Sequence, residues 1–309
     1  YMGPLPDYFR YFLHTCHRNP EFNFIVINDS IAESYSDKNV RVIKQSFSDL
    51  NSLVSKKLGE TVVLGNSWKI CDLKPLYGFL FAEEIQTFDF WGFCDLDIIW
   101  GNISTFMKPE LLREYDVIST KEKWVSGHFT LFRNTEDLRK LFEYHPNIAT
   151  MLNTHVYYAF EECYHRWEGT FYTFEELTQK GWKPSMFDII KNSEAQGKLR
   201  ACFKDIIREY PQKINYEYNN GTFKDLINGE QFMYYHLLTV KKIWRFYIPY
   251  YSHTPEKMLI THQGIQNLEE WVITWNLRRY LSCARGIAKS IRKQGIRVIL
   301  KKLVNKTTS

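Results

Sequence analysis

The segment FDFWGFCDLDIIWGNI, residues 88–103, places two carboxylates inside an aromatic and apolar run. The continuous stretch DFWGFC is typical of a buried strand, where an unpaired charge is costly. Asp95 and Asp97 follow it directly, so we expect the strand to reach solvent or a ligand at this point. In an extended segment, side chains two residues apart point the same way, about 6.5 Å apart along the strand. Both carboxylates can therefore face one site.

Strands and helices alternate around this segment. We predict strands over 22–30, 39–47, 89–94 and 115–120, and helices over 46–59, 69–88 and 105–115. This alternation predicts an α/β domain with a mostly parallel central sheet flanked by helices. Ligands of such sheets bind beyond the carboxyl ends of strands, which is where Asp29 and the Asp95/Asp97 pair lie.

The pattern becomes less regular after residue 124. We predict a strand over 124–134, a helix over 135–153 broken at Pro146, a hairpin over 213–226 closed around Asn219-Asn220-Gly221, and a short strand over 231–238. From Leu268 onward the sequence favours helices. We expect one domain over residues 1–250 and a helical, basic extension over 251–309.

Composition narrows the class of protein. The 309 residues are 44% hydrophobic and 24% charged, which suits one large domain with a sizeable core. No apolar stretch reaches the roughly 18 residues that a membrane span needs, and no secretory signal is seen. The six cysteines form no CxxC pair, which predicts reduced thiols of a cytosolic protein. The nine histidines show no paired zinc-ligand spacing.

The C-terminal region is strongly basic. No acidic residue follows Glu270, whereas ten of the 40 lysines and arginines do. The remaining 30 basic residues face 35 acidic ones, so the body carries about −5 and the tail +10. A basic amphipathic helix predicts contact with an anionic membrane surface, although a solvated helix packed on the domain also fits. Nucleic-acid binding is not expected, because the body is acidic and no recognition motif is present.

Two carboxylates at a strand end can hold a hard divalent cation, or one can hold the cation while the other takes a hydroxyl or water. A bound Mg²⁺ or Mn²⁺ would let acidic residues bind an anionic nucleotide. A solvated strand end explains the same DxD pattern. A metal-dependent phosphotransferase would use it too, but no Walker-type glycine loop or kinase signature accompanies it.

The sequence motifs on both sides of Asp95 and Asp97 resemble those of a known family. KICDLKPLYGFLF, FDFWGFCDLDIIWGNI, VSGHFTLFRN and FMYYHLL occur in this order after the opening GPLPDYFRYFLHTCHRNPEFNFIVINDS. Together they resemble bacterial GT-A glycosyltransferase-like proteins from polysaccharide and lipopolysaccharide gene clusters, over residues 1 to about 245. The resemblance implies a GT-A-like fold whose first strand is missing here.

The resemblance also implies a metal site. Asp95 and Asp97 would be the DxD that binds Mn²⁺ or Mg²⁺ and the diphosphate of a nucleotide-sugar donor. His236 matches a late histidine that supplies a third ligand, and neutral imidazole suits Mn²⁺. A structural histidine in an aromatic strand is the alternative.

Further residues are candidates for the donor site. Asp72 and Lys74 would contact the donor. The alternative is that Asp72 caps the N-terminus of a helix and Lys74 lies in solvent. Asp29, at the end of an early strand, would contact base or ribose, or act as a cap.

A glycine-containing strand beside the donor sugar would present Ser126, Gly127 and His128. Glycine allows close backbone approach there. A β-bulge in an edge strand explains the same three residues.

Glycosyl transfer with inversion needs a carboxylate base. The stretch YYAFEECYHRW, residues 157–167, offers Glu161 and Glu162 and resembles an FDE-like stretch of the family, with glutamate replacing aspartate at 161. Helix-surface charges are the alternative for both. Trp124 is a candidate contact on the acceptor side.

These features predict a metal-dependent glycosyltransferase. It would transfer a sugar, galactose or galactofuranose among the candidates, from a UDP-linked donor to a lipid-linked or growing surface glycan. A carboxylate base favours inversion. We expect the enzyme in the cytoplasm, peripheral at the inner face of the cell membrane. The alternative is a non-catalytic glycan- or nucleotide-binding module of a polysaccharide assembly.

Overall fold

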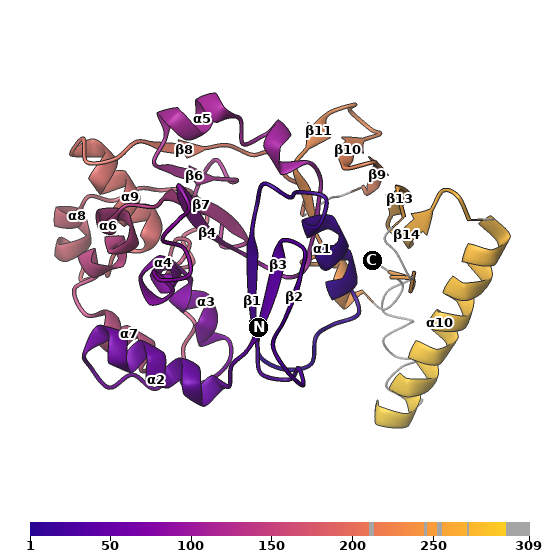
Figure 1. Ribbon diagram of the computed structural model, residues 1–309, viewed down its shortest axis with the longest axis horizontal. Coiled ribbons are helices and arrows are strands. Elements are labelled where there is room, and N and C mark those ends of the chain that lie inside the picture. Colours follow the sequence, from indigo (N-terminus) through magenta and orange to yellow (C-terminus); the bar gives the residue numbers. More distant parts are fainter. Residues whose placement is uncertain (210–212, 244–245, 252–254, 271, 295–309) are drawn as a thin grey trace.

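The computed structural model describes residues 1–209, 213–243, 246–251, 255–270 and 272–294, and in the last helix only the backbone of 272–273, 286–287 and 289–294. Its elements form an α/β fold, as the sequence predicts (Figure 1).

The DxD segment leaves a four-stranded sheet. The sheet is ordered β4-β7-β6-β8 and is built from β4 (Phe90–Cys94), β6 (Val117–Ser119), β7 (Phe129–Arg133) and β8 (Ala201–Phe203). Strand β7 runs antiparallel to both of its neighbours, whereas β6 and β8 are parallel. Strand β4 is thus an edge of this sheet among the described residues.

Two smaller sheets adjoin it. The first has the order β1-β3-β2 and consists of β1 (Phe24–Asn28), β2 (Tyr35–Asp37) and β3 (Val40–Lys44). Strands β1 and β3 are parallel, and β2 is antiparallel to β3. The second is an antiparallel pair, β5 (Ile98–Trp100) with β12 (Tyr234–His236).

The expectation of a mostly parallel sheet is wrong. Of the ten strand pairings among the described residues, only β1–β3 and β6–β8 are parallel. The loop over residues 120–128 is short for the crossover of a dozen or more residues that parallel neighbours need. It joins β6 to β7 as antiparallel neighbours instead. The alternation of strands and helices therefore predicted the class but not the strand directions.

A five-stranded antiparallel sheet lies toward the C-terminus. Its order is β11-β10-β9-β13-β14, formed by β9 (Asn215–Asn219), β10 (Thr222–Asp225), β11 (Gln231–Phe232), β13 (Lys257–Thr261) and β14 (Gly264–Asn267). The predicted hairpin is confirmed, since Asn220 and Gly221 turn with φ of 47° and 88°. Because β13 pairs with β9, the sheet crosses residue 250, where we expected a domain boundary before a helical extension.

The helices are shorter than the sequence suggests. They are α1 (Phe9–Cys16), α2 (Phe47–Leu58), α3 (Lys69–Leu73), η1 (Lys74–Leu76), α4 (Tyr77–Leu80), η2 (Ile103–Thr105), α5 (Pro109–Glu114), α6 (Glu136–Arg139), η3 (Leu141–Tyr144), α7 (Ile148–Leu152), α8 (Phe174–Gln179), α9 (Met186–Ala195), η4 (Val240–Lys242) and α10 (Val272–Gln294). The helix predicted over 69–88 ends at Leu80, and Pro75 falls in a 3₁₀ turn that divides it. The break predicted at Pro146 separates η3 from α7.

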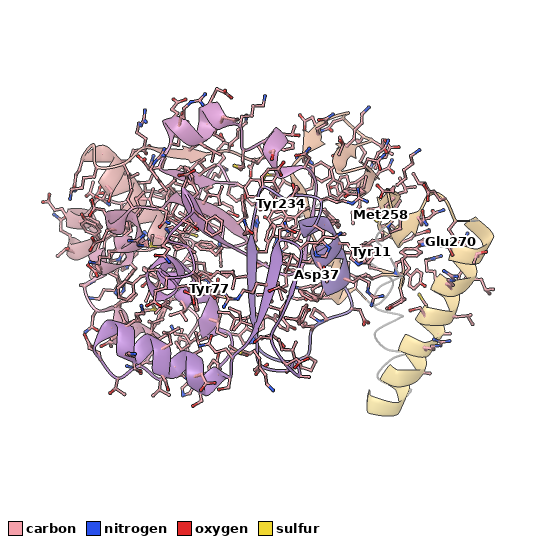
Figure 2. The ribbon with its side chains drawn as sticks, viewed as in Figure 1. Tyr11, Asp37, Tyr77, Tyr234, Met258 and Glu270 are labelled. Atoms are coloured by element: carbon pink, nitrogen blue, oxygen red, sulfur yellow. The ribbon has the colours of Figure 1, made fainter. Side chains whose placement is uncertain are left out.

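Two apolar cores flank the chain as it leaves β4. On one side, Trp91 stacks on Phe132 with ring centroids 4.6 Å apart. On the other, Trp100 packs edge-on against Tyr234 at 5.0 Å, both fully buried; Figure 2 shows Tyr234 in the interior of the molecule. Each buried aromatic contributes about 1.5–3 kcal/mol. Residues 95–97 join the two cores, which fixes the position of the DxD.

The last helix, α10, projects from the body (Figure 1). Trp275 anchors its first turn by donating to Ile265 O at 2.8 Å, and Arg278 pairs with Glu270 at 2.8 Å. Leu277, Tyr280 and Leu281 are 50–64% exposed. Among the described residues, no helix combines the length and apolarity of a membrane span. The tail positions Arg297, Val298, Lys301, Lys302 and Lys306 lie outside the described residues.

Candidate metal centre and acidic loop

The DxD forms a bend between two sheets. Strand β4 ends at Cys94 and β5 begins at Ile98, so Asp95, Leu96 and Asp97 connect them. The amide of Asp95 donates to His128 O at 3.2 Å. Asp97 is 4% exposed, while Asp95 is half-buried. The two carboxylates therefore mark the point where a buried strand turns, and only Asp95 is open to solvent to any extent.

Strand pairing brings His236 to these carboxylates. In the β5–β12 register His236 lies opposite Ile98, and the amide of Leu237 donates to Asp97 O at 2.8 Å. His236 Nε2 is 3.3 Å from Asp97 Oδ2 and 3.7 Å from Asp95 Oδ2. One ligand atom of each residue lies within 4.8 Å of the others. The three residues proposed as metal ligands from the sequence thus meet in space; we call them the metal centre.

Glu209 joins the metal centre, and the sequence gave no sign of it. Its Oε2 lies 3.0 Å from His236 Nδ1 and 3.2 Å from His128 Nε2, and its other oxygen pairs with Lys121. The backbone explains its place, because the amide of His236 donates to Arg208 O at 2.9 Å. The segment IREYPQK around Glu209 looks like an ordinary charged loop in the sequence.

Glu209 also fixes the role of each nitrogen of His236. In the neutral ring, with Nδ1 donating to Glu209, the lone pair of Nε2 faces Asp95 and Asp97. Nε2 is buried and has no hydrogen-bond partner among the described residues. Metal-binding histidines usually donate their second nitrogen to a carboxylate in this way. The donor set, two carboxylates and one oriented imidazole, fits Mn²⁺ well and Mg²⁺ less well, because Mg²⁺ prefers oxygen ligands only.

The charges of the metal centre compensate one another. Burial raises the pKa of Asp97, but the neighbouring His236 and Lys241 outweigh burial, so the pKa is lowered. Burial lowers the pKa of His236, yet Asp97 and Glu209 raise it to about 9. The pKa of Glu209 is lowered as well, since contacts with His128, His236 and Lys121 outweigh its burial. A divalent cation at Nε2 would displace a proton held by the same carboxylates.

Lys74 is a buried cation beside Asp95. Its Nζ donates to Asp95 Oδ1 at 2.6 Å and to Gly127 O at 2.7 Å. Burial lowers the pKa of Lys74, but Asp95 more than offsets this, and the pKa is raised well above its usual value. Of the two donor-site candidates in this turn, Lys74 is therefore charged and in contact with the DxD.

Asp72 serves the fold instead. It is fully buried, and its oxygens accept from the amides of Tyr158 at 3.0 Å and Phe160 at 2.9 Å and from Lys69 Nζ at 2.8 Å. These contacts direct both oxygens at the chain itself. Asp72 holds the segment that carries the two candidate bases.

Residues 157–167, which we call the acidic loop, are strained and irregular. Ala159, Tyr164 and His165 have φ of 56°, 48° and 64°, a region that side chains rarely adopt. No helix forms over these residues, so Glu161 and Glu162 are not helix-surface charges. Strain of this kind, costing about 1–3 kcal/mol per residue, concentrates at functional sites.

Glu161 is a buried acid. It is 2% exposed, its Oε1 accepts from Tyr157 OH at 2.8 Å, and its Oε2 has no hydrogen-bond partner among the described residues. Burial raises the pKa of Glu161 to about 8; nearby Lys74 lowers it and repulsion by Glu162 raises it further. At neutral pH this carboxyl is mostly protonated.

Glu162 is more accessible and lies against Gly127. Its Oε1 accepts from the Gly127 amide at 3.0 Å, and its Oε2 accepts from Trp167 Nε1 at 3.4 Å. Burial raises its pKa, and Lys74 partly opposes this. A Cβ at position 127 would lie 2.6 Å from Glu162 Oε1, so only glycine allows this approach. We expected the donor sugar to lie close to the backbone at Gly127; in the structure the carboxyl of Glu162 lies against this glycine.

Ser126 and His128 form a buried layer behind the metal centre. Ser126 Oγ lies 3.0 Å from His128 Nδ1, which is 2.5 Å from Tyr234 OH. Burial lowers the pKa of His128, although Glu209 opposes this, and the ring is neutral near pH 7. Residues 126–128 precede β7 in a turn and do not extend it as a bulge. His128 thus contacts Glu209, and Ser126 contacts His128.

Asp29 and Trp124 are not among the residues whose ligand atoms converge at the metal centre. Asp29 accepts from the Gly3 amide at 2.6 Å and from Ser30 Oγ at 3.0 Å, and no helix begins beside it, so it is not a helix cap. Trp124 is half-buried and packs on the apolar core around Trp91. Both have local structural contacts.

Comparison with known proteins identifies the family. A model described as a family of unknown function (DUF6625) matches residues 1–269, so the chain belongs to that family. No curated protein and no solved structure matches the chain. The family description assigns no activity, and the resemblance to glycosyltransferases stays a prediction.

Proposed function

We propose that the protein is a metal-dependent glycosyltransferase of GT-A type that uses a nucleotide-sugar donor, UDP-linked in the first instance. One observation carries the proposal: Asp95, Asp97 and His236 converge on one point, with the Nε2 of His236 directed toward both carboxylates and its Nδ1 held by Glu209. This is the arrangement of a divalent-cation site with its supporting shell.

In this proposal Asp95, Asp97 and His236 would hold Mn²⁺ or Mg²⁺. When bound, the cation would join the carboxylates to the donor diphosphate and neutralise the charge of the departing nucleotide. Lys74 adds a second positive charge beside Asp95. It would favour an anionic ligand at the same place.

Glu162 is the better candidate for the base. The acceptor hydroxyl must lose its proton as it attacks the anomeric carbon, and the base must be reachable. Glu162 is half-exposed beside Gly127, whose carbonyl is bound by Lys74. Glu161 is buried and mostly protonated at neutral pH, so it adds no negative charge beside Glu162 and leaves Glu162 free to ionise. A base in this position supports inversion.

The donor test is a thermal-shift panel of UDP-, GDP-, CMP- and dTDP-sugars, each with Mn²⁺ and with EDTA. A ligand at 100 times its Kd stabilises the folded state by about 2.7 kcal/mol. We expect a Mn²⁺-dependent shift with one nucleotide family, and Asp97→Asn should remove it. Asp137→Asn, which alters an exposed aspartate on α6, is the matched control. If no nucleotide sugar shifts the wild type in either condition, the donor assignment is wrong.

A second function is favoured by the ion pairs of the centre. Lys74 pairs with Asp95 and Lys241 pairs with Asp97, so the carboxylates are compensated without a cation. A glycan- or nucleotide-binding module of a polysaccharide assembly would need no more than this. The two proposals differ in turnover: the transferase releases UDP in the presence of Mn²⁺ and acceptor, whereas the module binds the nucleotide sugar without releasing UDP.

We also propose that α10 docks on an anionic membrane, which would place the enzyme at the inner face of the cell membrane near a lipid-linked acceptor. Leu277, Tyr280 and Leu281 present exposed apolar surface on a helix that also carries Arg278 and Arg285. Apolar burial and attraction to anionic lipid act together at such a helix.

Co-sedimentation with vesicles of phosphatidylglycerol and phosphatidylcholine tests this docking. Leu277→Ser/Leu281→Ser should release the protein, while Leu226→Ser/Ile227→Ser, at exposed apolar positions outside α10, should not. Equal partition of both double variants would refute the docking helix.

A further inference from the structure

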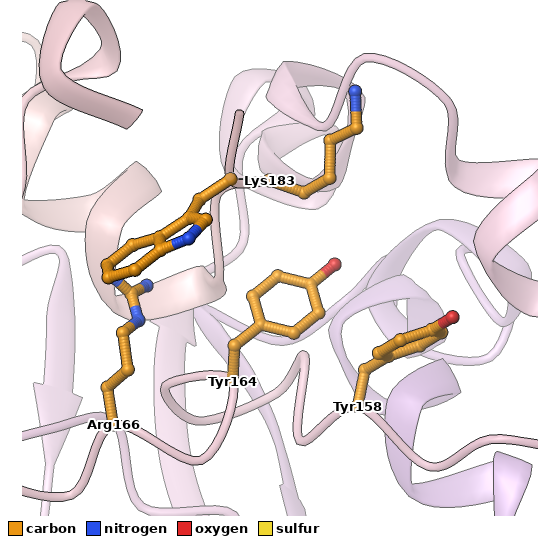
Figure 3. Close-up of a pocket in the computed structure, with 5 residues that line it drawn as sticks. Tyr158, Tyr164, Arg166 and Lys183 are labelled. Carbon is orange, nitrogen blue, oxygen red and sulfur yellow. The ribbon is translucent and has the colours of Figure 1, made fainter. Parts of the chain in front are cut away.

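A pocket of about 340 Å³ opens beside the acidic loop, apart from the metal centre. Tyr158, Tyr164, Arg166, Trp182 and Lys183 line it (Figure 3). Three lie on the acidic loop, and two lie in the segment between α8 and α9. Nothing in the sequence pointed to this grouping.

Tyr158 and Tyr164 form an aromatic wall of the pocket, and their contacts hold this wall in place. The rings of Tyr158 and Tyr164 lie 5.7 Å apart at an interplanar angle of 71°. The amide of Tyr158 is bound to Asp72, and Tyr164 OH contacts His145 Nε2 at 3.0 Å. The left-handed backbone of Tyr164 aims its ring into the pocket. Such a wall needs no rearrangement to receive a ligand.

The charged groups of the pocket are positive. Arg166 pairs with Asp188, but its Nη1 is buried and has no hydrogen-bond partner among the described residues. Lys183 is exposed and forms no ion pair with any described residue. Lys180 lies 5.1 Å from the centroid of the Trp182 ring. The pocket therefore combines aromatic rings with two basic side chains, of which Lys183 has no acidic partner among the described residues.

We infer that this pocket binds a single sugar ring that carries a negative charge. The volume lies at the lower end of the range for small-molecule pockets, about 300–1,000 Å³, which favours a ligand of monosaccharide size. The C–H groups of a sugar face pack on the negative face of an aromatic ring. The exposed Lys183 would bind the carboxylate of a uronic acid or the phosphate of a sugar phosphate, with the Arg166 guanidinium lining the same pocket.

The role of the bound sugar depends on the proposed function, whereas its binding does not. The acidic loop carries both the pocket and Glu162. In a glycosyltransferase the pocket would therefore hold a charged residue of the acceptor glycan. This assignment as an acceptor subsite rests on the proposed function.

Saturation-transfer NMR and calorimetry on the full chain, without nucleotide and with EDTA, test the binding. The probes are glucuronate, glucose 6-phosphate and glucose. We expect saturable binding of at least one anionic sugar with Kd near 1 mM, and weaker binding of glucose. The two anionic probes decide between carboxylate and phosphate.

Two variants at exposed positions connect the binding to the pocket. Lys183→Ala should weaken the anionic sugar about five- to tenfold and leave glucose unchanged, because one charge-assisted contact is lost. Trp182→Ala should weaken every sugar. Lys224→Ala, an exposed lysine on β10, is the matched control and should change nothing.

The proposal is overturned if no anionic sugar binds at about 20 mM, or if Lys183→Ala and Trp182→Ala bind like wild type. Because metal and nucleotide are absent, failure of the donor test leaves this result unaffected. Binding of an anionic sugar in this pocket without release of UDP would support the pocket and count against the transferase.

Discussion

The metal centre and the acidic loop are two clusters of buried carboxyls on either side of Lys74, and they behave in opposite ways. At the metal centre, Asp97 and Glu209 are surrounded by imidazole and ammonium groups, and the pKa of each is lowered. In the acidic loop, Glu161 lies beside Glu162 in an apolar setting, and its pKa rises to about 8. Residues of one chemical type are thus kept charged in one place and protonated in the other.

The difference separates two tasks. Carboxylates that stay ionised suit cation binding, because ligand oxygens must be deprotonated. Carboxyls whose pKa is near the working pH suit proton transfer.

Glu209→Gln should have the largest effect. It removes the negative charge between His128 and His236, so we expect a loss of about 3–5 kcal/mol in the free energy of unfolding. Mn²⁺ affinity should fall 10- to 100-fold, because the imidazole loses its orienting partner. Denaturant titration and metal titration measure the two effects. Glu122→Gln, at an exposed glutamate next to Lys121, is the control; equal behaviour of the two variants would remove Glu209 from the metal centre.

Glu161→Gln should change the pH dependence of stability. The folded pKa of Glu161, about 8, lies above the ordinary value of 4.5, so the folded chain holds one more proton between these values. The free energy of unfolding of the wild type should therefore fall as pH rises through this window. The variant has no such proton to lose.

Wild type and Glu161→Gln should unfold alike at pH 4, and at pH 9 the variant should be more stable by a few kcal/mol, on the order expected for a shift of this size. Denaturant titrations across this range measure the difference. Glu168→Gln, at the exposed position directly after the acidic loop, should follow the wild type. A Glu161→Gln difference that does not vary with pH would show that Glu161 is ionised in the folded protein.

Gly127→Ala should disturb the acidic loop and spare the metal centre. The new methyl would lie within 3 Å of the Glu162 carboxyl, so we expect a loss of about 1–3 kcal/mol in the free energy of unfolding. Mn²⁺ affinity should be unchanged.

A double-mutant cycle is the control for that clash. Adding Glu162→Ala to Gly127→Ala removes the obstructing side chain and should recover most of the lost stability. Additive losses would mean that the alanine acts elsewhere.

Asp29→Asn should have the smallest effect. Asp29 accepts two local hydrogen bonds, and asparagine can retain an accepting oxygen, so stability should change by less than about 0.5 kcal/mol. Nucleotide-sugar affinity should stay at the wild-type level in calorimetry. A tenfold loss of affinity would return Asp29 to the donor site.

The sequence predicted local features well. The strand over β1, the helix α2 and the Asn220-Gly221 hairpin each depend on a few neighbouring residues, and the structure contains all three. The meeting of Asp95, Asp97 and His236 was expected from a resemblance, since no local rule links residues so far apart.

Other features depend on long-range packing that a single sequence does not encode openly. The direction of β7 is set by a short loop, and β13 pairs with β9 across some 40 residues. In the sequence, Glu209 looks like a solvent-exposed acid. In the structure, the amide of His236 on β12 donates to the carbonyl of Arg208, which places Glu209 beside the imidazole. Likewise, Asp72 was a candidate ligand until its oxygens proved to hold two amides of the acidic loop.

That last contact has a mechanical consequence. Asp72 accepts a hydrogen bond from the acidic loop, and two residues later Lys74 donates one to Asp95. A single turn of the chain therefore contacts both clusters. A substitution that removes the Asp72 carboxylate would therefore loosen the acidic loop and also disturb the turn that positions Lys74 beside Asp95. A local change at Glu162, by contrast, leaves this turn intact.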